Sequence, residues 1–235
     1  MFEINDDNII VASDIGPQKK SAIIIDNFYK DPHSIRELCL RLKKNSTYDN
    51  SDLPGPRSVL YHDNVKKKLK PLFDELCSDF RIWGKSLKRK DYNDNWESAE
   101  FICNYINDDS LLKSPVGSLP HQDAYKLMEE FNTFLPPTQF GVVIYLNTPE
   151  ECNGGTNLYS LDGFMTVDSP PRNTFGNTYH MINDSIVNGD RWKVEHELEM
   201  VYNRCIIFPS DVLHGQSIEL GMFTDYDRIV QVLFL

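Results

Sequence analysis

Residues 192–202 read WKVEHELEMVY, and apolar and charged side chains alternate along this stretch. Successive side chains of a β-strand point to opposite faces of a sheet, so the alternation predicts a half-buried antiparallel strand. The face expected to point inward carries Trp192, Val194, His196, Leu198, Met200 and Tyr202. This pattern favours a β-rich protein.

Further strands are predicted on both sides of that stretch. Apolar runs at 101–106, 140–146, 205–208 and 229–234 are typical of buried strands. Two short β-type runs, 9–11 and 22–25, flank the turn signal Gly16-Pro17 and predict a hairpin-like pair.

Helices are predicted only in the first part of the chain. Asp31-Pro32 is typical of a helix N-cap followed by the first helical residue. A second helix is expected over 65–80, with a kink or a break at Pro71. We therefore expect one α+β, mainly β domain over 1–235, in which residues 1–95 form a helical and strand support for a β core at 96–235.

Composition excludes several classes of protein. The 235 residues carry 24 basic and 35 acidic side chains, a net charge of −11, which argues against coating nucleic acid. Residues 66–90 are locally basic and predict either a solvated helix face or a docking patch for an acidic partner. The chain has no apolar run long enough to span a membrane, which takes about 18 residues. Its five scattered cysteines and acidic start favour the reducing cytoplasm.

Four residues stand in an order that indicates a metal site. His121-Gln122-Asp123 places a histidine and a carboxylate two apart, where a strand projects both to one side. His214 follows a buried strand, and Arg228 opens the last one. Two histidines and one carboxylate on Fe(II) leave open positions, which can take a 2-oxo acid and O₂. An arginine can hold the distal carboxylate of that acid by two parallel hydrogen bonds.

With these motifs the sequence resembles the 2-oxoglutarate/Fe(II)-dependent oxygenases, in particular the prolyl-hydroxylase-like branch. The matching segments are 121–123, Tyr-Leu-Asn at 145–147, Gly-Gly-Thr at 154–156, 208–214 and 228–232. Segments 26–32 and 54–57 resemble an uncharacterised bacterial and phage branch of that superfamily.

The resemblance implies a double-stranded β-helix (jelly-roll) core with N-terminal helices packed on one sheet. It implies Fe(II) held by His121, Asp123 and His214, with Arg228, Tyr145 and Tyr105 at the co-substrate 2-oxoglutarate. The implied activity is hydroxylation of an unactivated C–H, with O₂ consumed and 2-oxoglutarate decarboxylated to succinate. The implied substrate is an amino acid, a peptide or protein, or a small metabolite. The oligomeric state is left open, and neither a membrane nor nucleic acid is expected as a partner.

Two other functions stay open at this point. A cupin-like protein could use the same barrel to bind a metal or ligand without turnover. A zinc hydrolase could use two histidines and a carboxylate, but it leaves Arg228 and Tyr145 without a role. Residues 160–191 read as a long functional loop, in which Arg172 and His180 are candidates for the substrate entrance. Arg57 is a comparable candidate, whereas His196 is expected to be a core or groove residue.

Overall fold

The computed structural model describes residues 2–5, 8–46, 55–60, 63–83, 101–113, 120–122, 140–166 and 191–235. Three parts of the expected site fall outside these ranges: Asp123, Arg172 and His180. Most of the expected 160–191 loop also lies outside the described residues.

In the described residues of the N-terminal part lie three strands and three helices: β1 (Ile9–Ile15), β2 (Lys20–Ile25), α1 (Pro32–Lys43), β3 (Arg57–Leu60), α2 (Asp63–Ser78) and α3 (Phe80–Trp83). The remainder is mainly β: β4 (Phe101–Ile106), α4 (Asp108–Lys113), β5 (Phe140–Tyr145), η5 (Pro149–Glu151), β6 (Gly155–Leu161), β7 (Trp192–Glu199), β8 (Cys205–Pro209), β9 (His214–Ser217) and β10 (Arg228–Phe234).

The strands of the described ranges form two antiparallel sheets. Within these ranges the large sheet has seven strands in the order β1-β2-β8-β5-β10-β4-β3, and the small sheet has three in the order β7-β6-β9. The N-terminal part therefore supplies both edges of the large sheet, with the β1–β2 hairpin at one edge and β3 at the other. The hairpin has the expected pairing, with Ile9 opposite Ile25.

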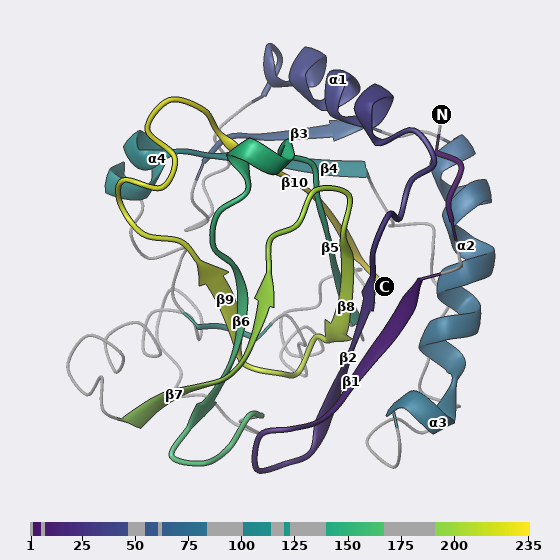
Figure 1. Ribbon diagram of the computed structural model, residues 1–235, viewed down its shortest axis with the longest axis vertical. Coiled ribbons are helices and arrows are strands. Elements are labelled where there is room, and N and C mark those ends of the chain that lie inside the picture. Colours follow the sequence, from purple (N-terminus) through teal and green to yellow (C-terminus); the bar gives the residue numbers. More distant parts are fainter. Residues whose placement is uncertain are drawn as a thin grey trace, which may run out of the picture.

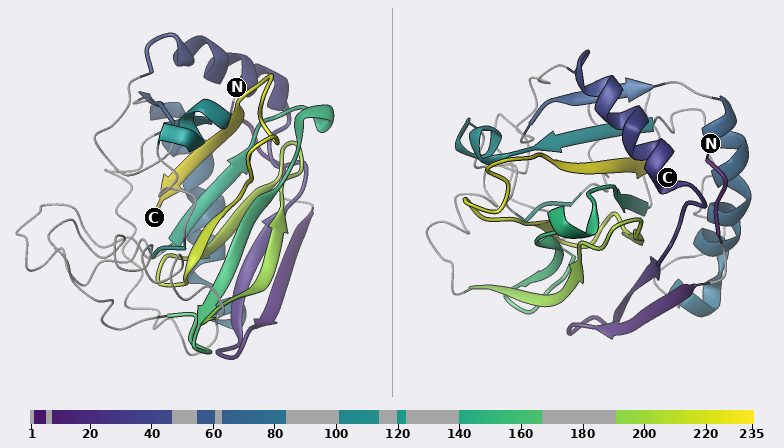
Figure 2. Two further views of the ribbon diagram at one scale, coloured as in Figure 1. Left: turned by 90° about the vertical axis from the view of Figure 1, so that its left-hand side faces the viewer. Right: turned by 45° about the horizontal axis from the view of Figure 1, so that its top comes forward.

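The large sheet separates two apolar cores. One core joins it to α1 and α2 and includes Ile35, Phe73, Tyr105 and Ile229. The other core lies between the two sheets and includes Tyr145, Leu158, Leu198, Phe208 and Val230. Figures 1 and 2 show the same layering, with α1 and α2 outside the large sheet and β6, β7 and β9 on its opposite side.

Helix α1 begins where its local sequence signal predicts, whereas α2 does not break at its proline. The carboxylate of Asp31 accepts a hydrogen bond from the backbone N–H of Ser34 at 3.1 Å, which confirms the expected N-cap of α1. Helix α2 runs through Pro71 as one element, so no break occurs there.

None of the helices in the described ranges is long and apolar enough to cross a membrane.

Strand β7 departs from the expected alternation. Leu158 pairs with His196 while the next residue, Tyr159, pairs with Val194, so Glu195 is an extra residue that forms a bulge. The bulge changes which side chains face inward next to it. Leu198 is 1% exposed as expected, but Val194 is 48% exposed, so the inward placement of Val194 was wrong. The carboxylate of Glu195 instead accepts a hydrogen bond from Ser160.

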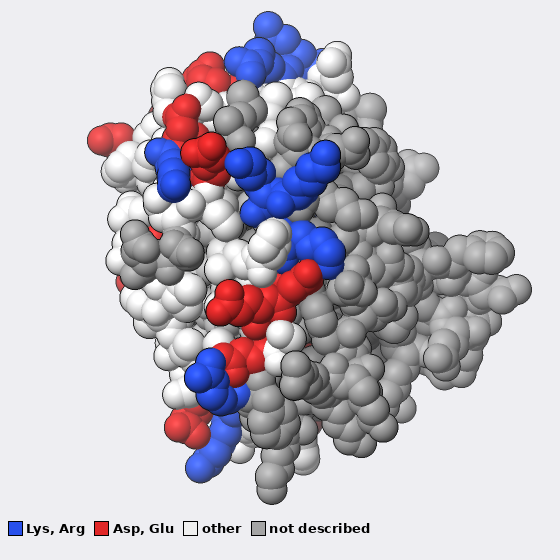
Figure 3. Space-filling view, turned by 90° about the vertical axis from the view of Figure 1, so that its right-hand side faces the viewer, with Lys and Arg blue, Asp and Glu red and all other residues white. Residues whose placement is uncertain are grey.

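The basic stretch expected at 66–90 is described only in part. There Lys68 pairs with Glu3, Lys70 with Asp74 and Arg81 with Asp79, so three of its cations have acidic neighbours. Figure 3, which faces the side that carries α2, shows acidic side chains lying between basic ones. These observations favour a solvated helix face over a continuous basic patch.

Candidate functional site

The fold brings His121 and His214 together, although they are far apart in the sequence. Their backbones form an isolated antiparallel bridge, in which each N–H donates to the other residue's carbonyl oxygen at 2.8 and 2.9 Å. The two imidazole ring centroids lie 4.4 Å apart. Two potential metal ligands therefore stand side by side, as the spacing of the motifs predicts.

The tautomer of His214 suits metal binding. Its ring is 5% exposed, and Nδ1 lies 2.8 Å from the carbonyl oxygen of Val212. A carbonyl oxygen can only accept a hydrogen bond, so Nδ1 must carry the proton. In the neutral ring the lone pair is then on Nε2, and a backbone carbonyl behind Nδ1 is a common support for a metal-bound histidine.

The third expected ligand, Asp123, is not among the described residues. Within those residues, no group of three His, Cys, Asp or Glu side chains is placed to hold a metal ion. The complete metal site accordingly stays a prediction that adds Asp123 to the observed histidine pair.

Arg228, the first residue of β10, is 2% exposed and points between the two sheets. Its Nη1 donates to the side chain of Gln216 at 3.2 Å, and its Nη2 donates to the carbonyl of Gly155 at 3.3 Å. Among the described residues its Nε has no hydrogen-bond partner, and no carboxylate acts on the guanidinium. Burial lowers the pKa of Arg228, because removal from water penalises the charged form.

Tyr145 lies beside this arginine. Its ring centroid is 5.5 Å from the guanidinium carbon of Arg228, which is within the range of a cation–π contact. The Tyr145 hydroxyl shares a 2.8 Å hydrogen bond with Thr156 and donates to the carbonyl of Leu198 at 3.3 Å. Burial raises the pKa of Tyr145, so this hydroxyl stays protonated at neutral pH. It is therefore a hydrogen-bond donor beside Arg228.

The Gly154-Gly155-Thr156 motif has a structural reason. Gly154 has φ +66°, and a Cβ there would lie 1.9 Å from the carbonyl oxygen of Ser217. A Cβ on Gly155 would lie 2.3 Å from the carbonyl oxygen of Leu198. Both glycines allow β6 to fit between its neighbours, which brings the Gly155 carbonyl and Thr156 close to Arg228 and Tyr145.

The structure does not bring Tyr105 to this place. On β4, Tyr105 pairs with Ile229 rather than Arg228, so its ring lies on the helix-facing side of the large sheet. Its hydroxyl donates to the backbone carbonyl of Cys39 in α1 at 2.6 Å. Burial raises its pKa. Tyr105 therefore does not belong with Arg228, and its expected place at the co-substrate is corrected.

A neighbouring residue that the sequence analysis missed faces the space between the sheets. Asn104 pairs with Val230, is 5% exposed, and its Oδ1 has no hydrogen-bond partner in the described part of the chain. A lone amide inside the apolar run FICNYI was the available signal, because buried polar groups need partners. Arg57 of β3 pairs with Asn104 and is half-buried. His196 is half-buried on β7, as expected of a groove residue.

Comparisons with known proteins place the chain in a family. A family model described as a family of unknown function (DUF6445) matches residues 7–228, so the chain belongs to that family. No curated protein matches it.

Several solved structures are similar to the chain at low identity. A prolyl-4-hydroxylase from Pseudomonas putida is 12% identical, with a TM-score of 0.48 and 92% of each chain covered. A prolyl 4-hydroxylase from Phytophthora capsici is 13% identical, with a TM-score of 0.45 over 91% of this chain and 57% of the other. An N-substituted L-amino acid dioxygenase from Burkholderia ambifaria is 14% identical, with a TM-score of 0.44 over 93% of this chain and 83% of the other.

Proposed function

We propose that this protein is an Fe(II)/2-oxoglutarate-dependent dioxygenase with a double-stranded β-helix core. It would hydroxylate an unactivated C–H of an amino-acid, peptide or protein, or small-metabolite substrate. The observation that carries the proposal is Arg228, a fully buried cation with an unused donor and no carboxylate partner in the described residues. Burying such a charge costs free energy unless a ligand supplies the missing partner.

The positions of Arg228 and His214 suit a short dicarboxylate. His214 and Gln216 are two apart on β9, so their side chains project to the same side about 7 Å from each other. Gln216 contacts Arg228 directly. A ligand with one carboxylate on Arg228 and its other end near the histidine pair would span about that distance, as a five-carbon 2-oxo acid can.

The residues present fit the implied iron. His121 and His214 would supply two nitrogen ligands, and Asp123 is the proposed carboxylate ligand. Bound iron would supply the oxidative chemistry that couples O₂ and the decarboxylation of 2-oxoglutarate to C–H hydroxylation. The protein's own part is to hold the co-substrate through Arg228 and Tyr145 and to keep water out between the two sheets.

The experiment is aerobic turnover of the purified protein with Fe(II), 2-oxoglutarate and a panel of amino acids, peptides and metabolites. We expect succinate, and a product heavier by one oxygen atom in mass spectra. His214→Ala should abolish both, while His33→Ala, in helix α1 on the other side of the large sheet, should leave both unchanged. Binding of 2-oxoglutarate without its conversion to succinate in the presence of any panel member would instead support the non-catalytic binding protein.

A further inference from the structure

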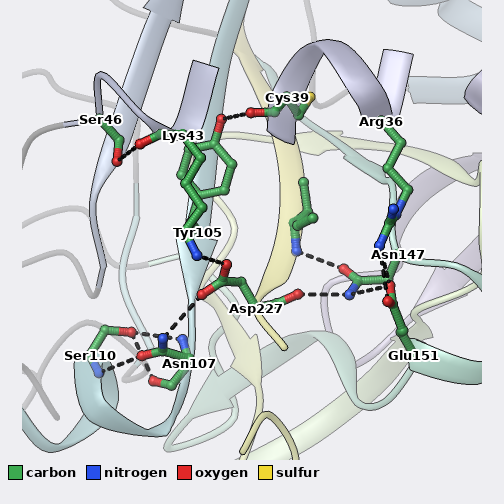
Figure 4. A network of polar contacts seen from close by, with 11 residues as sticks. Arg36, Cys39, Lys43, Ser46, Tyr105, Asn107, Ser110, Asn147, Glu151 and Asp227 are labelled. Carbon is green, nitrogen blue, oxygen red and sulfur yellow. Dashed lines mark hydrogen bonds and ion pairs between the residues drawn. The ribbon is translucent and has the colours of Figure 1, made fainter. Parts of the chain in front are cut away.

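The side chain of Asn147 bridges the backbone on both sides of Arg228. Asn147 lies two residues after the end of β5 and is fully buried. Its Nδ2 donates to the carbonyl of Asp227 at 2.8 Å, and its Oδ1 accepts the N–H of Ile229 at 2.6 Å (Figure 4). The amide therefore binds the residue before and the residue after the arginine.

This bridge continues the sheet where β5 ends. The ladder between β5 and β10 pairs Tyr145 with Val230, and the N–H of Leu146 still donates to the carbonyl of Ile229 at 3.1 Å. Beyond Leu146 the chain that follows β5 no longer pairs with the start of β10. The Asn147 side chain donates through Nδ2 and accepts through Oδ1, so it takes the place of a backbone peptide group.

Ion pairs from α1 hold both ends of the bridge. Arg36 donates to both oxygens of Glu151 at 2.8 and 2.9 Å, and Glu151 accepts from Asn147 at 3.4 Å. On the other side, the carboxylate of Asp227 pairs with Lys43 of α1. Figure 4 shows the two α1 cations reaching down to these two carboxylates. The bridge is thus tied to the outer helix on both sides of Arg228.

We infer that Asn147 is a positioning residue for Arg228 and sets the affinity of the site for the 2-oxo acid. The guanidinium makes hydrogen bonds of 3.2 and 3.3 Å and lies 5.5 Å from the centroid of the Tyr145 ring, while its Nε has no partner within the described chain. Because both hydrogen bonds are long, its direction also depends on the backbone that carries it. A bidentate contact with a carboxylate requires the planar group to be aimed correctly. This inference rests on the proposed function.

The test compares Asn147→Ala with a matched amide. Asn203 makes the same kind of bridge, accepting from the N–H of Tyr29 and donating to its carbonyl, both at 2.9 Å. Its φ is +62°, so Asn203→Gly removes the amide without backbone strain. The probe is 2-oxoglutarate titrated into anaerobic Fe(II)-protein, with Fe(II) affinity measured separately in its absence.

Asn147→Ala should bind 2-oxoglutarate about tenfold or more weakly, because a small misplacement of a binding group can cost up to about a hundredfold. Its Fe(II) affinity should stay within about twofold of the native value, while Asn203→Gly should change neither. Asn147→Asp keeps an acceptor for Ile229 but no donor for Asp227, so it should lose affinity in the same direction. Native affinity for 2-oxoglutarate in either folded Asn147 variant would overturn the inference.

Amide hydrogen exchange at Ile229 tests the bridge without any ligand. Exchange there should be faster in Asn147→Ala than in the native protein, and unchanged in Asn203→Gly. Unchanged exchange in Asn147→Ala would overturn the bridge itself. If the bridge holds but native Fe(II)-protein does not bind 2-oxoglutarate, the proposed function fails, and the inference about affinity fails with it.

Discussion

Replacing Arg228 by methionine should stabilise the ligand-free protein while removing 2-oxoglutarate binding. The guanidinium is fully buried, has no carboxylate among its described neighbours and makes two long hydrogen bonds. Replacing buried charges by well-packed apolar residues is often neutral or stabilising by about 1–4 kcal/mol. Each kcal/mol shifts the melting temperature by about 2–4 °C for a chain of this size.

With Fe(II) and 2-oxoglutarate the order of stability should reverse. A ligand at 100 times its Kd stabilises the native protein by about 2.7 kcal/mol, and Arg228→Met should gain little of this. A charge-assisted contact is worth about 1.5–3 kcal/mol, or roughly ten- to a hundred-and-fifty-fold in affinity. Arg228→Lys should recover only part of it, because an ammonium group lacks the planar fork.

Denaturant unfolding of each variant, with and without ligand, measures both effects. Arg204→Met is the matched control, because Arg204 is paired with the carboxylate of Asp26 at 2.6 and 3.1 Å. That variant should be destabilised without ligand and keep its gain from 2-oxoglutarate. If Arg228→Met is destabilised by more than about 2 kcal/mol without ligand, then Arg228 is a structural residue and the reasoning is refuted.

Three further predictions concern Tyr145 and Asn104 near Arg228 and the helix cap Asp31. Tyr145→Phe should weaken 2-oxoglutarate binding about two- to tenfold. The effect should be smaller than that of losing Arg228, because the Tyr145 hydroxyl already bonds Thr156. An unchanged Kd would mean that Tyr145 does not contact the co-substrate. Asn104→Leu should not lower the melting temperature without ligand, because Oδ1 of Asn104 has no partner among the described residues. The same variant should lower kcat/KM. A large fall in its melting temperature would show that Asn104 is a structural residue. The hydrogen bonds from Ser34 lower the pKa of Asp31, so its contribution to stability is present above the unfolded pKa and lost as the pH falls through the folded one. Urea unfolding of Asp31→Ala should show a smaller stability loss in acid than the native protein, and parallel acid profiles would count against this cap.

Local signals were sufficient for the elements that depend on few residues. The cap of α1 follows from Asp31 and Pro32 alone, and the β1–β2 hairpin follows from two apolar runs around a turn. The bulge at Glu195 could not be predicted, because an extra residue in β7 is defined only by its pairing with β6. The reversed exposure of Val194 follows from that pairing.

The candidate site was predictable in part for the same physical reason. The order of the motifs predicts that the chain returns across the sheets, and His121 and His214 lie side by side. Arg228 faces the interior from the start of β10. The run FICNYI has apolar side chains on both faces, so the sequence did not decide which face Tyr105 occupies. Asn147 was missed because its side chain replaces a backbone partner, which only the sheet register reveals.

The central claim is that His121, His214 and Arg228 form one site for Fe(II) and a 2-oxo acid. The most direct measurement is the visible absorption of the anaerobic Fe(II)-protein as 2-oxoglutarate is added. We expect a metal-to-ligand band that saturates in the native protein and in His33→Ala. The band should be absent in His214→Ala and should need far more 2-oxoglutarate in Arg228→Ala. No band in the native protein, or an unaltered band in His214→Ala, would contradict the claim.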